Sequence, residues 1–313
     1  MDMILELMNM DLTNVVMKIT LYLSLITIAM MLFHGQKLKT IDYLADKTKE
    51  HQDTSRQVST NFHKRFRLIS ASIVLITSAI TIVWFFIRVG ELAEQGFAGM
   101  FDQLMVQLLW SSSVGDAVML RIISLAIAFI AIMFMSRQDV TNGKRILLTV
   151  SLTLSFITLL ASFTFIGHVA ELGKLYRLLI ILHIGTMAWW FSALIPFYFI
   201  IKYMQPRELH KLLVQFGRQA EKWLMLLLVS GFFLSLKLVD DIESLFFTPY
   251  GQVLVTKLTV VLLTLIIALF HKVWIVPKLL SKDKRYILKR SLLLECTFAF
   301  LILLLAGVLA RGQ

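Results

Sequence analysis

Two histidines, His168 and His183, have the type and the spacing to bind a ligand together. His168 ends one long apolar run, and His183 lies 15 residues later, inside the next run. Met187 follows His183 by four residues and therefore shares its helix face. A neutral imidazole and a thioether are soft ligands that favour Cu(I) over harder cations. The three residues predict an outer copper site, although an interfacial His168 and a merely packing Met187 are the plainer interpretations.

Three further polar residues are weaker candidates. Glu171, three residues after His168, could bind the metal or accept a hydrogen bond that orients the imidazole. Glu295 and Cys296 lie near the start of the last apolar run. Glu295 is expected either to pair with a neighbouring base such as Arg290 or to form, with Cys296, an inner relay or exit site. Cys296 is the only cysteine, so an internal disulfide is excluded.

The elements that must position these residues are membrane helices. The chain is 58% hydrophobic and holds eight apolar runs, each near or above the roughly 20 residues that cross a bilayer. The runs are Val15–Phe33, Leu68–Ile87, Ala117–Met135, Ile146–Ile166, Tyr176–Ile201, Trp223–Val239, Val253–Val276 and Leu292–Ala310. The sequence predicts an all-α, polytopic membrane protein with eight transmembrane helices.

Basic residues are sorted to one side of this array. The connections after the first, third, fifth and seventh runs hold 23 of the 31 Lys and Arg, whereas acids gather in the alternate segments. Lys and Arg remain on the cytoplasmic side. Both termini are therefore expected outside, with His168 and His183 at the outer side and His34 and His271 at the inner side. The net charge of +11 then reflects the bilayer surface rather than nucleic acid.

The chain is expected to form a single transmembrane domain, residues 1–313. An N-terminal half, 1–145, has three spans and an amphipathic external connection, and a second half, 146–313, has five spans. Arg121 follows Gly115 by six residues, as Lys257 follows Gly251, which predicts a 4+4 parallel repeat. Arg121 and Lys257 are expected to extend toward the membrane interface.

Residues 160–310 resemble the CopD (PcoD) copper-resistance membrane proteins. The resemblance is carried by Gly167-His168-Val169-Ala170, Leu182-His183, Trp190, Pro196, Phe216, Ala220, Gly231, Thr248-Pro249-Tyr250-Gly251, Lys257, Pro277 and Glu295. The chain departs from the family where Trp190-Phe191-Ser192-Ala193 replaces a Trp-x-Gly-Gly pattern and where His271 replaces Asn. The resemblance implies copper uptake across the cytoplasmic membrane of a bacterium, with a separate CopC-like copper donor outside.

These observations predict a copper transporter rather than an enzyme. No GxxxxGK[ST] loop is present, so transport driven by nucleotide hydrolysis in this chain is disfavoured. The alternative is a membrane electron carrier or assembly factor that binds haem b. In that interpretation His168 and His183 would bind iron at the outer side, and His34 and His271 at the inner side.

Overall fold

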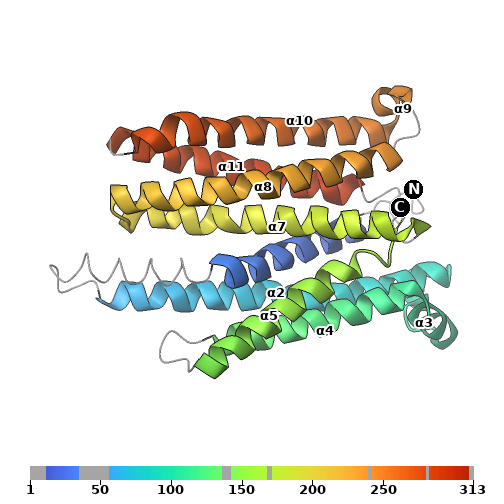
Figure 1. The fold of residues 1–313 in the computed structure, drawn as a ribbon. Coiled ribbons are helices and arrows are strands. Elements are labelled where there is room, and N and C mark those ends of the chain that lie inside the picture. Colours follow the sequence, from blue (N-terminus) through green and yellow to red (C-terminus); the bar gives the residue numbers. More distant parts are fainter. Residues whose placement is uncertain are drawn as a thin grey trace. The chain divides into compact units, whose positions relative to one another are not determined.

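The computed structural model describes residues 12–34, 56–135, 142–167, 171–238, 242–279 and 282–309, and their regular structure is helical (Figure 1). Eight of these helices are long and apolar enough to cross a membrane, which confirms the predicted fold class. They are Leu12–His34, Arg65–Leu92, Ser113–Phe134, Asn142–Ser162, Lys174–Tyr203, Pro206–Lys237, Pro249–Lys278 and Lys284–Leu309.

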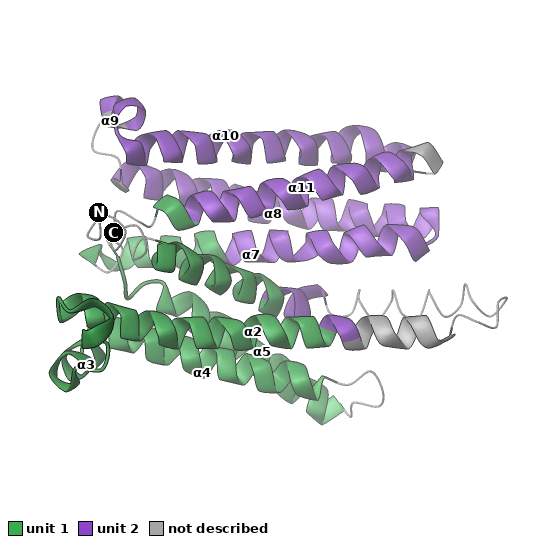
Figure 2. Ribbon diagram, turned by 180° about the vertical axis from the view of Figure 1, so that it is seen from behind, with its two compact units in different colours: residues 1–28, 67–184, 307–313 green, residues 29–66, 185–306 purple. Residues whose placement is uncertain are grey.

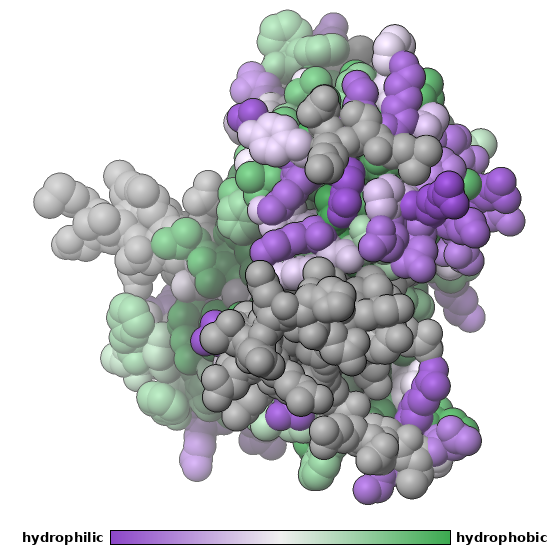
Figure 3. All heavy atoms as spheres, turned by 90° about the vertical axis from the view of Figure 1, so that its left-hand side faces the viewer, coloured by the Kyte–Doolittle hydropathy of each residue, from purple (hydrophilic) through white to green (hydrophobic). Residues whose placement is uncertain are grey.

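Three helices begin well before their apolar runs. Helix α2 spans Arg56–Leu92, α8 spans Pro206–Leu238 and α11 spans Lys282–Leu309. Lys, Arg, Glu and Gln are good helix formers, so the backbone bonds continue into the polar region. Proline at the first position of α8 fits the first turn, where no backbone N–H is needed. In Figure 3, hydrophilic side chains gather over the region where α7 ends and α8 begins.

The remaining long helices are α4 (Ser113–Phe134), α5 (Asn142–Ser162), α7 (Lys174–Tyr203) and α10 (Pro249–Phe270). Short helices α3 (Gln103–Trp110) and α9 (Ile242–Phe247) precede α4 and α10. The turn from α3 into α4 requires Gly115, because a Cβ there would lie 2.0 Å from the Trp110 carbonyl oxygen. Ser112 caps α4 and Thr248 caps α10 through their hydroxyls.

The helices divide into two compact units (Figure 2). Unit 1 comprises residues 1–28, 67–184 and 307–313, and unit 2 comprises residues 29–66 and 185–306. Both the first span and α7 therefore contribute residues to each unit. The halves expected from the sequence, divided at residue 145, stay a prediction.

Unit 1 is held by small polar residues at its helix contacts. Helices α4 and α5 pack together, and the Ser124 and Ser155 hydroxyls donate to each other's backbone carbonyls at 2.7 and 2.8 Å. The Thr77 hydroxyl of α2 donates to the Thr20 carbonyl of the first span at 3.1 Å. Small hydroxyl residues allow helices to approach closely inside a membrane.

The side chain of Arg121, on α4, lies at the centre of unit 1. It is 2% exposed, so the prediction that it extends to the interface is wrong. Its guanidinium donates to the Met17 sulfur at 3.2 Å and to the Ser162 hydroxyl at 3.4 Å, and lies 5.7 Å from the Trp84 ring centre. These partners come from the first span, α5 and α2. Packing against soft acceptors and an aromatic face holds the cation inside the protein.

Basic residues beyond the apolar runs also cap helices. Arg67 donates to the carbonyl of Met135, the C-terminal cap of α4, at 3.0 Å within unit 1. In unit 2, Arg285 donates to the carbonyls of Ile201 and Met204 at the end of α7. The last carbonyls of a helix have no partner within the helix, and cations are favoured there. Part of the positive charge therefore stabilises helix ends.

Candidate functional site

Helix α7 carries two of the candidate ligands, His183 and Met187. His183 is half-buried, and Met187 is buried one turn further along. His183 lies nine residues from the first residue of α7, about 14 Å along the axis at 1.5 Å per residue. The helix runs through Pro196 without interruption, so both side chains belong to one continuous element. An imidazole and a thioether four residues apart on one helix are soft groups that could bind Cu(I).

The other two candidates, His168 and Glu171, precede α7 in the sequence. His168 lies outside the described residues, so its expected position opposite His183 stays a prediction. Gly167, just before it, has φ 82°, a left-handed conformation that favours glycine, and the chain turns here. Glu171 is exposed and precedes Gly173, just ahead of α7. Among the described residues, no group of three or more His, Cys, Asp or Glu side chains could hold a metal ion.

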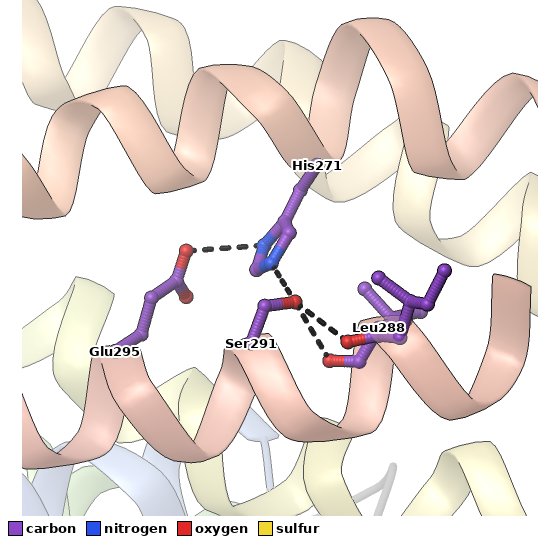
Figure 4. A network of polar contacts seen from close by, with 5 residues as sticks. His271, Leu288, Ser291 and Glu295 are labelled. Carbon is purple, nitrogen blue, oxygen red and sulfur yellow. Dashed lines mark hydrogen bonds and ion pairs between the residues drawn. The ribbon is translucent and has the colours of Figure 1, made fainter.

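A second polar cluster lies in unit 2, between the end of α10 and α11 (Figure 4). The His271 Nδ1 lies 3.0 Å from the Glu295 carboxylate, an ion-pair contact rather than a well-aligned hydrogen bond. The His271 Nε2 lies 2.5 Å from the Ser291 hydroxyl, which also contacts the carbonyls of Ile287 and Leu288. Glu295 is 3% exposed. A buried carboxylate is stable in a membrane helix only with such a partner.

Local helix geometry presents this histidine to α11. Residues His271–Ile275 form a single π-helical turn that continues α10. Such turns insert an extra residue into a helix and are frequent at functional sites. Ser291 and Glu295 are four residues apart on α11, so both face His271 from one side of that helix. Imidazole, hydroxyl and carboxylate together can bind or pass on a proton.

The partner of Glu295 differs from the sequence expectation. Arg290 lies over the Tyr286 ring at 5.5 Å, and the carboxylate contacts His271 of the preceding span. Cys296, the other inner candidate, is a free thiol of intermediate exposure. Spacing along α11 could point only to neighbours on that helix, whereas the observed partner is 24 residues away in the sequence.

Two family patterns match the chain. The pattern described as Copper resistance protein D matches residues 210–309, which include α10, α11 and the His271–Glu295 pair. The pattern described as Copper resistance protein D-like, N-terminal domain, matches residues 10–176. The chain belongs to the copper resistance protein D family. It is therefore a multi-pass membrane protein of copper resistance and copper transport.

Family membership confirms the resemblance inferred from the second half of the sequence. The N-terminal family pattern matches residues 10–176, most of which lie before the motifs that carried the resemblance. Comparison with curated proteins and with solved structures gives no match.

Proposed function

We propose that this copper resistance D protein carries copper inward across the cytoplasmic membrane. Cu(I) is captured at the outer side by His183 and Met187, with His168 and Glu171 as further ligands, and both termini lie outside. A separate CopC-like protein would deliver the ion. The observation that carries the proposal is the imidazole–thioether pair one turn apart on α7, inside the apolar part of a membrane helix.

The charge asymmetry supports the inward direction. With the basic connections in the cytoplasm, the His183–Met187 pair belongs to the outer half of α7. The membrane potential, negative inside, favours entry of a monovalent cation by about 2.3 kcal/mol per 100 mV. A soft site on the outer side can then load the ion without nucleotide hydrolysis.

The His271–Glu295 pair supports a relay on the inner half of the path. His271 begins the π-helical turn after α10, seven residues before the end of the Pro249–Lys278 span, and Glu295 faces it from α11. A carboxylate and an imidazole in contact can release a proton when a cation approaches and take one up again after the cation has left. Cys296, next along α11, is the candidate for the exit.

The haem alternative is less well supported by the inner cluster. Both ring nitrogens of His271 have partners, Glu295 and Ser291. Ligation of haem iron by His271 would break one of these contacts. A Soret band in protein purified from haem-replete cells would revive this alternative for His34, His168, His183 and His271.

Two measurements test the proposal. Copper accumulation in cells expressing the protein should fall in His183→Ala, with membrane insertion unchanged. For orientation, single cysteines at positions 208 and 284, in a chain whose Cys296 is replaced by Ser, should react only with membrane-permeant reagents. Reaction of position 284 with an impermeant reagent in intact cells would reverse the topology and contradict uptake through an outer His183 site.

A further inference from the structure

We propose that Met30, Met31 and His34 form a second Cu(I) site, at the inner end of the first span, with the aromatic rings of Trp189, Phe197 and Phe216 around the imidazole. The inference rests on the proposed function for the identity of the cargo only. The site itself is argued from unit 2, to which all of these residues belong.

The three side chains share one buried face of the first span. Met30 and Met31 precede His34 by four and three residues, the spacings that put side chains on one face. Met30 is 4%, Met31 5% and His34 2% exposed, whereas Phe33 between them is 45% exposed. The helix therefore turns two thioethers and an imidazole into the protein and an aromatic ring toward the outside.

Aromatic rings from two other helices surround the imidazole. The His34 ring centre lies 6.2 Å from Trp189 and 6.5 Å from Phe197, both on α7, and 6.3 Å from Phe216 on α8. Trp189 and Phe216 are stacked on each other at 5.3 Å, so these rings enclose the imidazole on the side of α7 and α8.

The donor set selects a soft, monovalent cation. Thioethers bind Cu(I) and contribute little to Zn(II) or Mg(II), which prefer carboxylates and water. In unit 2 the buried Glu295 is engaged by His271. The sequence after His34 is rich in lysine, so attraction by negative charge cannot hold a cation here. Soft coordination supplies the attraction instead.

The site also repeats the chemistry of the outer pair. His183 and Met187 are four residues apart on α7, as Met30 and His34 are on the first span. In the proposed topology one pair faces the outer side and the other the inner side. Because the two sites offer the same kinds of ligand, a Cu(I) ion can move from one to the other without a large change in coordination energy.

The test uses the full-length protein in detergent, anaerobically, titrated with Cu(I) buffered by bathocuproine disulfonate. Met30→Leu/Met31→Leu keeps the apolar volume, and His34→Phe keeps the ring. The double methionine variant and His34→Phe should each bind about one equivalent less Cu(I) per chain, or bind Cu(I) with an affinity at least ~10-fold weaker. Cu(I) should also quench tryptophan fluorescence in the native protein, and Trp189→Phe or His34→Phe should remove most of that quenching.

Met225→Leu is the matched control, because Met225 is 68% exposed on α8. It should bind Cu(I) and be quenched like the native protein. Native Cu(I) content and quenching in both the double methionine variant and His34→Phe would overturn the second site. An equal loss in Met225→Leu would also overturn it. If the native protein binds Cu(I) at Met30, Met31 and His34 but cells expressing it accumulate no copper, the result contradicts the proposed uptake and leaves this site supported.

Discussion

The buried Arg121 cluster of unit 1 and the buried His271 cluster of unit 2 differ in whether they can exchange a proton or a metal ion. In unit 1, Arg121 contacts the Met17 sulfur, the Ser162 hydroxyl and the Trp84 ring. In unit 2, His271 contacts Glu295 and Ser291. A guanidinium is permanently charged and has no lone pair for a metal or a proton, whereas imidazole and carboxylate accept both.

The difference predicts different functions for the two units. In unit 1, Arg88 and Arg121 both lie near the Trp84 ring, and Arg88 pairs with Glu91 at 2.6 Å. Two guanidinium cations near one ring are expected to repel a passing cation. The soft and acidic side chains that could carry copper gather in unit 2 and on α7, so variants in the two centres should behave differently.

The largest effect is expected from Glu295→Ala. It leaves the His271 imidazole buried without its carboxylate, and breaking a buried pair costs about 3 kcal/mol of folding free energy. Copper accumulation should fall to that of cells lacking the protein, even after correction for protein level. Accumulation per molecule should be measured together with thermal unfolding in detergent. Near-native accumulation in the correctly inserted variant would remove the pair from the transport path.

His183→Ala should be next. Loss of one ligand is expected to lower copper accumulation about 10-fold, with membrane insertion intact, because backbone hydrogen bonds are satisfied within each helix. His168→Ala should have a similar effect, and the double variant should be no worse than either single variant, since one loss already dismantles a shared site. Additive losses would indicate that the two histidines act at separate sites.

Met187→Leu should have a smaller effect. The substitution keeps volume and apolarity, so folding should be unaffected. Cu(I) affinity at the outer site should weaken by about 1 kcal/mol, roughly fivefold. Competition titration with a Cu(I) chelator measures this difference, and Met225→Leu provides the exposed control. Native affinity in Met187→Leu would reduce Met187 to a packing residue.

The smallest effect on copper should come from Arg121→Met, in the other centre. Replacing a buried cation by an apolar side chain of similar volume is often neutral or stabilising by about 1 kcal/mol. Copper accumulation should match that of the native protein, and the unfolding temperature should hold or rise. A loss of accumulation as large as in Glu295→Ala, with folding preserved, would abolish the contrast between the two units.

The sequence alone determined the number of spans, the class of fold and the family. Twenty apolar residues in a row must form a helix in a bilayer, because no other conformation of a single segment satisfies its backbone there. The helix starts were less predictable. Pro206 opens α8 17 residues before the apolar run at Trp223, because polar helix formers continue a helix that hydrophobicity does not mark.

Side-chain partners were decided by tertiary structure. Nothing near Glu295 in the sequence identifies His271, and nothing near Arg121 indicates that Met17 and Trp84 would surround it. The aromatic rings around His34 include Trp189 and Phe216, which lie more than 150 residues later in the sequence on two other helices. Apolar patterning reports which segments enter the membrane, but it carries almost no information on which faces meet. Those contacts depend on the shapes and polar groups of side chains far apart in the sequence.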